Sequence, residues 1–234
     1  MGLTKIQEYY LQTIGVDVYW SRDGVLVEPV TDEVKTTDDP VLNKAISESG
    51  EWEVLRESVA SCQQCELHCG RTQTVFGVGD QHADWLIIGE APGAEEDRQG
   101  EPFVGRAGKL LNSMLFAVGL QREQVFIANI LKCRPPNNRD PKPEEVDACS
   151  SYLREQIDLI QPKIILAVGR IAAQNLMKTE TPIGKMRGQR YQYADTGIPL
   201  VVTYHPAYLL RSPREKRKVW QDLQLAMRVY QETA

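Results

Sequence analysis

Four cysteines in two pairs are the residues best suited to chemistry in this chain of 234 residues. Two residues separate Cys62 from Cys65, and 15 residues separate Cys133 from Cys149. Four soft thiolates suit an iron–sulfur cluster or a structural zinc ion, and the ligands alone leave both open. A fifth cysteine, Cys69, lies close enough to compete, but we prefer the set of four, which leaves Cys69 as a small buried hydrophobe. We expect a structural metal site that holds loops in place and does not take part in electron transfer.

A turn that follows an apolar run is the second feature with chemical potential. Residues Gly89 to Gly93 read Gly-Glu-Ala-Pro-Gly, and such a turn can present backbone N–H groups to a ligand. Farther along, Phe103 lies in a segment with a proline and several glycines. Core packing is the usual fate of phenylalanine, but a loop position would let the ring stack on a planar ligand.

Short apolar runs alternate with longer helical stretches from residue 85 onward. The expected strands are Trp85–Ile88, Val125–Ile130, Ile164–Val168 and Leu200–Thr203, and the expected helices are Glu51–Ala60, Ala107–Val118, Pro143–Ile160, Arg170–Met177 and Glu215–Tyr230. This alternation is typical of an α/β fold, in which helices cover both faces of a parallel sheet.

Polar or glycine residues stand at the carboxyl end of each expected strand. They are Gly89-Glu90, Asn129, Gly169 and His205. Open α/β sheets bind ligands outside these strand ends. All four expected strands place such residues at the same end. This shared placement is the best evidence from the residues themselves for a ligand-binding site.

The acidity of the chain is concentrated near its N-terminus. The net charge is −5, but residues 1–61 hold 5 Lys/Arg against 12 Asp/Glu, and the remainder holds 22 against 20. Basic residues crowd the stretch from Arg211 to Lys218. Such a run attracts phosphate backbones. It is equally typical of a solvated helix face, and the charges alone do not decide.

Composition favours a folded protein, because hydrophobic residues make up 42% of the chain. No apolar run approaches the roughly 20 residues of a membrane span, and the N-terminus lacks the pattern of a secretory signal. We expect a cytoplasmic protein with no membrane contact and with reduced thiols. Residues 1–50 are expected to form an N-terminal extension, with a helix over 3–14, a strand over 16–20 and an acidic linker. Residues 51–234 would then form the functional domain.

Five motifs together resemble those of the family 4 uracil-DNA glycosylases, the iron–sulfur branch of that superfamily. They are Cys-x2-Cys, Gly-Glu-Ala-Pro-Gly, Pro-Phe-Val-Gly-Arg-Ala-Gly, Asn-Ile-Leu-Lys-Cys-Arg-Pro-Pro and His-Pro-Ala, in that order between Cys62 and Trp220. The resemblance implies a three-layer α/β sandwich around a four-stranded parallel sheet, and a [4Fe–4S] cluster. It also implies a monomer that flips uracil out of DNA and hydrolyses its N-glycosidic bond.

The resemblance implies the uracil contacts, whereas the expected metal ligands follow from the cysteine spacing and the expected DNA contacts from the basic run and the apolar residues before it. The expected metal ligands are Cys62, Cys65, Cys133 and Cys149, the expected uracil contacts are Gly89, Glu90, Ala91, Phe103, Asn129 and His205, and the expected DNA contacts are Leu209, Arg211 and Arg214. His205 would stabilise the departing base. Other branches of the superfamily have Asp or Asn at the position of Ala91. An alanine side chain cannot activate water. Glu90 and Glu96 are therefore both candidates to orient water or stabilise the sugar cation, and Glu96 is also a candidate to block the thymine methyl.

Two other functions fit parts of the pattern. A metal-dependent nuclease or phosphoesterase would need clustered carboxylates, whereas the strand ends supply Glu, Asn and His. A zinc-stabilised, non-catalytic DNA-binding protein would not need Phe, Asn and His at separate strand ends.

Overall fold

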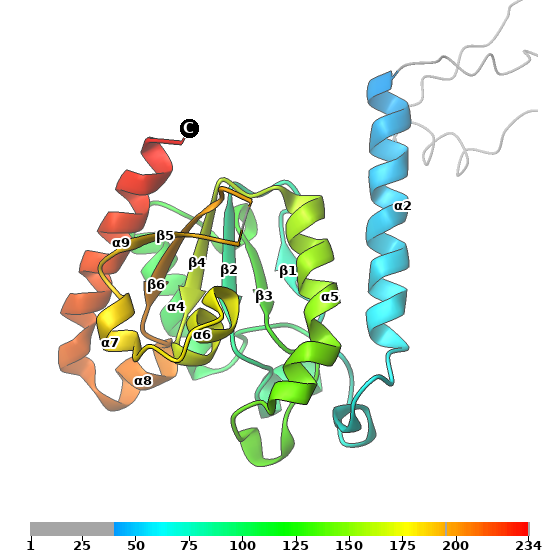
Figure 1. Cartoon of the computed structure of the whole chain (residues 1–234), viewed down its shortest axis with the longest axis horizontal. Helices are drawn as coiled ribbons and strands as arrows, with labels where there is room; N and C mark the ends of the chain where they lie inside the picture. Colours follow the sequence, from blue (N-terminus) through cyan, green and yellow to red (C-terminus); the bar gives the residue numbers. More distant parts are fainter. Residues whose placement is uncertain (1–39, 195, 234) are drawn as a thin grey trace, which may run out of the picture. The chain divides into compact units, whose positions relative to one another are not determined.

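A six-stranded sheet lies at the centre of the part of the chain that the computed structural model describes, residues 40–194 and 196–233 (Figure 1). The strands are β1 (Val78–Gly79), β2 (Trp85–Gly89), β3 (Phe126–Asn129), β4 (Ile164–Val168), β5 (Arg190–Gln192) and β6 (Pro199–Thr203). Their order is β1-β3-β2-β4-β6-β5. The four central strands are parallel, and β1 and β5 pair antiparallel at the two edges. The expected four-stranded parallel sheet is therefore confirmed, with two short edge strands added.

The helices are α2 (Pro40–Ala60), α3 (Ala94–Gln99), α4 (Arg106–Ala117), α5 (Pro143–Ile160), α6 (Arg170–Met177), α7 (Ile183–Met186), α8 (Pro206–Arg211) and α9 (Lys216–Gln231). The expected helices 143–160 and 170–177 match α5 and α6. Helix α2 begins at Pro40, inside the stretch expected to be a linker. The helix and strand expected before residue 21 lie outside the described residues. None of the described helices is long and apolar enough to cross a bilayer.

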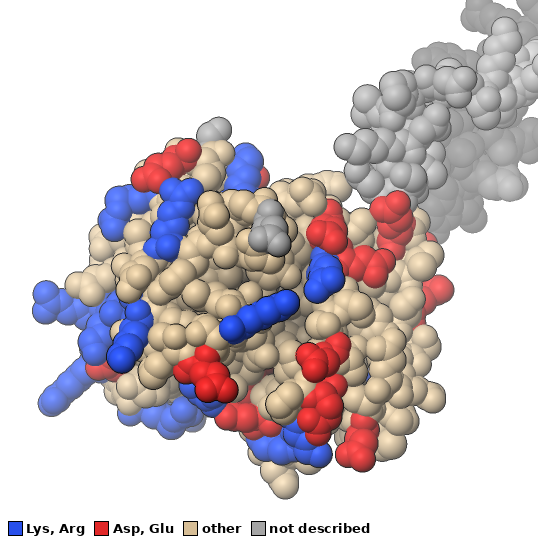
Figure 2. Space-filling view, viewed as in Figure 1, with Lys and Arg blue, Asp and Glu red and all other residues tan. Residues whose placement is uncertain are grey.

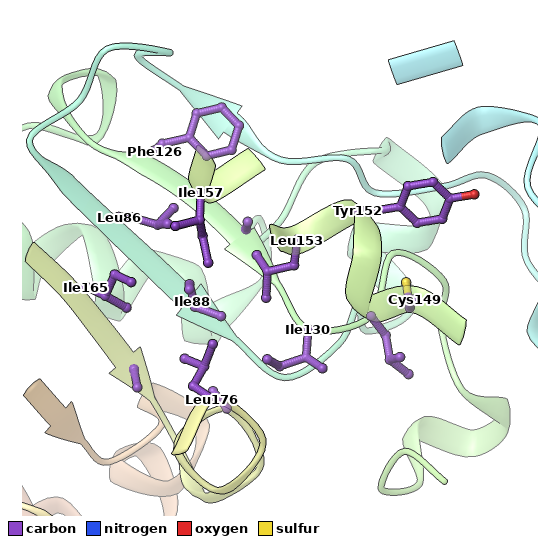
Figure 3. Packing of buried hydrophobic residues seen from close by; sticks show 14 of the residues in the cluster. Leu86, Ile88, Phe126, Ile130, Cys149, Tyr152, Leu153, Ile157, Ile165 and Leu176 are labelled. Atoms are coloured by element: carbon purple, nitrogen blue, oxygen red, sulfur yellow. The ribbon is translucent and has the colours of Figure 1, made fainter. Parts of the chain in front are cut away.

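The sheet is buried on both faces, which makes the fold a three-layer sandwich. Successive side chains of a strand point to opposite faces. Leu86 and Ile88 therefore pack under α5 and α6, as Figure 3 shows, whereas Trp85 and Ile87 pack under α4 and α9. Burial on both faces explains why the central strands are apolar runs without polar alternation.

The register of the sheet brings the ends of the parallel strands together. Gly89 at the end of β2 is opposite Asn129 at the end of β3, and Val168 of β4 is opposite Thr203 of β6. The residues that follow these strands therefore emerge at one edge of the sheet.

Candidate functional site

A pocket of about 800 Å³ lies at this edge of the sheet. Its lining includes the expected site residues Glu90, Ala91, Glu96, Phe103, Asn129, His205 and Arg211. Gly89, also an expected site residue, does not line the pocket; it is buried beside Asn129 and Phe103. The structure thus brings together residues that the sequence places on separate strands and loops.

Asn129 ends β3 with only 2% of its surface exposed. A Cβ atom on the neighbouring Gly89 would lie 2.4 Å from Asn129 Oδ1 and 2.6 Å from Phe103 Cζ. Only glycine at position 89 therefore leaves room for both the amide and the ring. No hydrogen bond to or from the Asn129 side chain is found among the described residues. Its polar atoms are nevertheless not sealed off from the outside. Its donor and its acceptor are both available to a ligand.

Phe103 is held in an unfavourable backbone conformation beside Asn129. Its φ angle is +54°, which is rare for a bulky residue. The Arg122 guanidinium donates to the carbonyl oxygen of Pro102 at 2.6 Å and to that of Phe103 at 3.4 Å. The ring of Phe103 stacks on that of His205 with centroids 5.5 Å apart. Strain of this kind persists where surrounding contacts over-determine the geometry, and it is common at ligand sites.

Glu96 holds the other side of the same loop. Its Oε1 accepts hydrogen bonds from the backbone N–H groups of Val104 and Gly105, both at 3.1 Å. Gly105 caps the N-terminus of α4, where a negative charge is favourable. Glu96 therefore positions the Phe103 loop, a role that sequence reasoning did not include.

His205 is oriented by the helix that follows it. Its Nδ1 accepts a hydrogen bond from the Ala207 N–H at 3.1 Å and so caps the N-terminus of α8. A neutral imidazole that accepts at Nδ1 carries its proton on Nε2. Burial, followed by the charge of Arg211, lowers the pKa of His205 to about 4, against a smaller opposing effect of Glu96. His205 is therefore a neutral hydrogen-bond donor near pH 7.

Gly169 makes room for His205. Its φ angle is +99°, and a Cβ atom there would lie 3.1 Å from the Cβ of His205. A larger residue would therefore be strained and would also crowd the imidazole.

Glu90 is a carboxylate of the pocket wall whose pKa is raised. Burial, and to a smaller extent the charge of Asp140, raise the pKa of Glu90 to about 7 against an opposing effect of Arg170. Arg170 and Asp140 form an ion pair of 2.5 Å on the pocket wall. Sequence reasoning missed this pair, although Arg170 directly follows the strand-end glycine. It also missed Arg122, because no local pattern marks that residue as part of the site.

Leu209 was expected to contact DNA, and the structure contradicts this. Its side chain is 1% exposed and packs in the core beside α4 and α9. Its neighbour Leu210 is 37% exposed, because successive residues of a helix point about 100° apart. Arg211 and Arg214 are exposed, as a contact to DNA requires.

The four expected metal ligands line one small enclosed space. Cys69 is exposed and does not line it; its sulfur lies 3.4 Å from His68 Nε2. Arg71 donates to the sulfur of Cys133 at 3.1 Å. Such donors stabilise thiolates that ligate a metal. Burial raises the pKa of Cys149 to about 11, so this side chain would be a neutral thiol unless a metal replaced its proton.

Four cysteine sulfurs suit either an iron–sulfur cluster or a structural zinc ion. No three His, Cys, Asp or Glu side chains within residues 40–194 and 196–233 are grouped so that they could hold one metal ion. A tetrahedral zinc site needs all four sulfurs about 2.3 Å from one atom.

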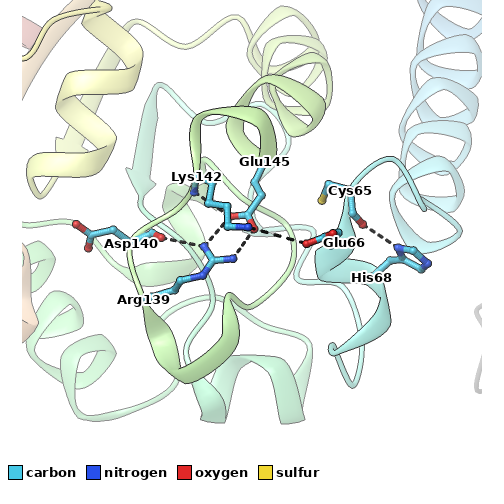
Figure 4. Close-up of polar contacts among 7 residues, drawn as sticks. All are labelled: Cys65, Glu66, His68, Arg139, Asp140, Lys142 and Glu145. Atoms are coloured by element: carbon cyan, nitrogen blue, oxygen red, sulfur yellow. Dashed lines mark hydrogen bonds and ion pairs between the residues drawn. The ribbon is translucent and has the colours of Figure 1, made fainter.

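The loop between Cys133 and Cys149 is fixed by charged contacts (Figure 4). Arg139 donates to both carboxylate oxygens of Glu145, at 2.9 and 2.5 Å. Lys142 pairs with Glu66 at 3.9 Å and so reaches the segment that carries Cys65. The pair of Lys142 and Glu66 thus lies between the segments that carry the two cysteine pairs.

Comparisons with known proteins identify the family. A family model described as the uracil DNA glycosylase superfamily matches residues 76–224. A type-4 uracil-DNA glycosylase of Archaeoglobus fulgidus is 47% identical over 176 residues, which cover 73% of this chain and 88% of that protein. Proteins of the same name from Sulfurisphaera tokodaii and Thermotoga maritima are 45% and 43% identical, over 73% and 74% of this chain and 80% and 92% of their own lengths. The chain therefore belongs to the uracil-DNA glycosylase superfamily, and within it to the type-4 uracil-DNA glycosylases.

Proposed function

We propose that this chain excises uracil from DNA by hydrolysing the N-glycosidic bond and leaving an abasic site. The observation that carries the proposal is the convergence of Phe103, Asn129 and His205 on one pocket. The enzyme would flip the nucleotide out of the helix, at a cost of about a few kcal/mol. The ring of Phe103 would then cover one face of the base.

Asn129 would read the identity of the base. Its amide offers a donor to O4 of uracil and an acceptor to N3–H, whereas cytosine presents the opposite pattern. Mispairing a buried polar group costs about 1–3 kcal/mol. Because Asn129 is buried and its amide is unpaired among the described residues, it is well placed for this discrimination.

His205 would stabilise the departing base. Uracil leaves as an anion while the sugar becomes oxocarbenium-like, and the Nε2–H of a neutral His205 would donate to O2 as the charge grows. The proton is fixed on Nε2 by the bond that Nδ1 accepts from Ala207. A donor fixed before the reaction needs no reorganisation and stabilises the transition state most effectively.

Glu90 is the carboxylate that we propose orients water or stabilises the sugar cation. Because its pKa is about 7, its ionised form increases as pH rises through neutrality. Single-turnover uracil release should therefore rise with pH across this range. Glu90→Gln should be slower and should lack this rise. Glu95→Gln, which removes an exposed carboxylate on α3 paired with Arg98, should keep the parental profile; an unchanged profile in Glu90→Gln would contradict the assignment.

DNA would bind across the basic side of the domain. Figure 2 shows Lys and Arg side chains gathered along the edge where α9 lies. Arg211 lines the pocket and Arg214 is exposed nearby in the chain, so both suit contacts to phosphates beside the flipped nucleotide. The partly exposed Leu210 is the residue that would fill the space left in the DNA stack by the flipped nucleotide.

The cofactor we propose is a [4Fe–4S] cluster held by Cys62, Cys65, Cys133 and Cys149. The cluster would cross-link the segment around Cys62 to β3 and α5, and glycosidic hydrolysis needs no electron transfer from it. We propose that the protein acts as a monomer. Reduced thiols suit the cytoplasm. Residues 51–234 would be the glycosylase domain, and the matched range 76–224 lies within it.

Replacing single cysteines tests the ligand set. Cys133→Ser should give colourless, poorly folded protein, because the serine removes a ligand from the enclosed space. Cys69→Ser should keep the brown colour, because Cys69 lies outside that space. Visible absorbance and iron content measure both outcomes. Colour lost on replacing Cys69 and kept on replacing Cys133 would show that the assigned set is wrong.

Uracil release in the presence of EDTA tests the proposed function. The protein should release uracil from a uracil-containing oligonucleotide and leave an alkali-labile site, since the proposed reaction uses no added divalent metal. A metal-dependent nuclease would instead cut the strand when divalent metal is present, and EDTA would abolish its activity. A metal-loaded protein that binds the oligonucleotide but releases no uracil would support a non-catalytic DNA-binding protein.

A further inference from the structure

Lys132 is a buried cation that neither the base-reading site nor the metal site yet explains. It lies between Leu131 and Cys133, and only 1% of its surface is exposed. Burying an ammonium group is costly unless hydrogen bonds and an opposite charge compensate it. The partners of Lys132 therefore indicate what its position serves.

The hydrogen bonds of Lys132 lead to the base-reading residue. Its Nζ donates to the backbone carbonyl oxygen of Asn129 at 3.1 Å and to the side-chain oxygen of Gln156 at 2.5 Å. Gln156 is itself fully buried, and its amide donates to the carbonyl oxygen of Phe76 at 2.9 Å. This network fixes the backbone at the end of β3, from which the Asn129 amide projects.

No carboxylate compensates the charge of Lys132 within the part of the chain that the structure describes. Both hydrogen-bond acceptors of its Nζ are neutral oxygens. Lys132 also lines the same enclosed space as the four cysteines, and its backbone N–H donates to the sulfur of Cys149 at 3.3 Å. The opposite charge available to Lys132 is therefore that of the metal-binding thiolates.

We propose that Lys132 is a positioning residue that couples the metal centre to base recognition: the negative charge of the thiolate-bound metal holds its ammonium group in place, and that group aligns Asn129. This inference rests on the proposed function for its second half. The metal centre would then support catalysis through electrostatics, in addition to cross-linking the chain. Lys132 touches no substrate, so it acts only through Asn129.

Lys132→Met tests the coupling with two measurements. Removing a positive charge near the cluster should shift its reduction potential to more negative values, as electrochemical titration measures. Single-turnover uracil release should fall by about ten- to a hundredfold, the usual effect of losing a partner that orients a site residue. In an Asn129→Ala background, however, Lys132→Met should slow release no further, because there is no amide left to align.

Arg71→Gln is the matched control, since Arg71 also carries a charge beside the metal site but contacts Cys133 and Ala60 rather than Asn129. Arg71→Gln should shift the reduction potential in the same direction as Lys132→Met. In the double variant with Asn129→Ala, the fold-changes in uracil release of the two substitutions should multiply, as independent effects do. If Lys132→Met does not fold, Lys132→Gln keeps a neutral donor and should show the same shift with a smaller loss of release.

An unchanged potential, effects of Lys132→Met and Asn129→Ala that multiply, or failure of both Lys132 variants to fold would overturn the proposal. Parental protein that releases no uracil would instead overturn the proposed function. The potential would still report whether Lys132 and the metal centre interact.

Discussion

Replacing His205 with alanine should slow single-turnover uracil release by about a hundred- to a thousandfold, the usual cost of losing one preorganised donor to a developing anion. The pKa of His205 is lowered to about 4 by burial. The imidazole is therefore neutral at pH 7 and donates through Nε2. DNA affinity and iron content should stay at the parental level, because the imidazole acts mainly in the transition state.

The same substitution removes the cap of α8, because His205 Nδ1 accepts from the Ala207 N–H. Loss of a cap costs about 0.5–2 kcal/mol of stability, so His205→Ala should also melt at a lower temperature. His205→Ser separates the two effects, since serine can cap the helix but is too short to reach the base. It should recover stability without recovering uracil release. Parental release by either folded variant, or recovered release in His205→Ser, would contradict the assigned role.

Most of the sheet and the strand-end residues could be predicted from the sequence, because both depend on local patterns. A strand buried on both faces is an apolar run of limited length. The residue after each run is therefore readable, and Asn129 and His205 line the pocket as expected. Strands β1 and β5, with two and three residues, are too short to leave a periodic pattern.

Features that depend on packing between distant segments could not be predicted. The contact between Lys132 and Gln156 joins residues 24 positions apart, and the contact between Arg122 and Pro102 joins residues 20 positions apart. No local pattern encodes either pair. Leu209 and Leu210 are adjacent in a helix of six residues, which is too short for its apolar periodicity to fix which side faces the core.

Asn129→Asp should lower uracil excision by orders of magnitude and shift any remaining activity towards cytosine. The substitution removes the donor that meets O4 of uracil, and a buried carboxyl group is favoured in its protonated form. A protonated acid can offer the donor and acceptor that match the edge of cytosine. The backbone should be little changed, because Asp and Asn have nearly the same shape and the Lys132 ammonium contacts only the main-chain oxygen of residue 129.

Asn138→Asp is the control for adding an acid to this pocket. Asn138 also lines the pocket, but it is exposed and its side-chain oxygen accepts from Arg134 at 2.8 Å. This variant should keep the parental preference for uracil. Release of uracil and cytosine from matched oligonucleotides, measured in single turnovers, gives the two selectivities. Full uracil activity in Asn129→Asp would remove Asn129 from base reading. An equal loss in Asn138→Asp would show that a general charge effect governs the pocket.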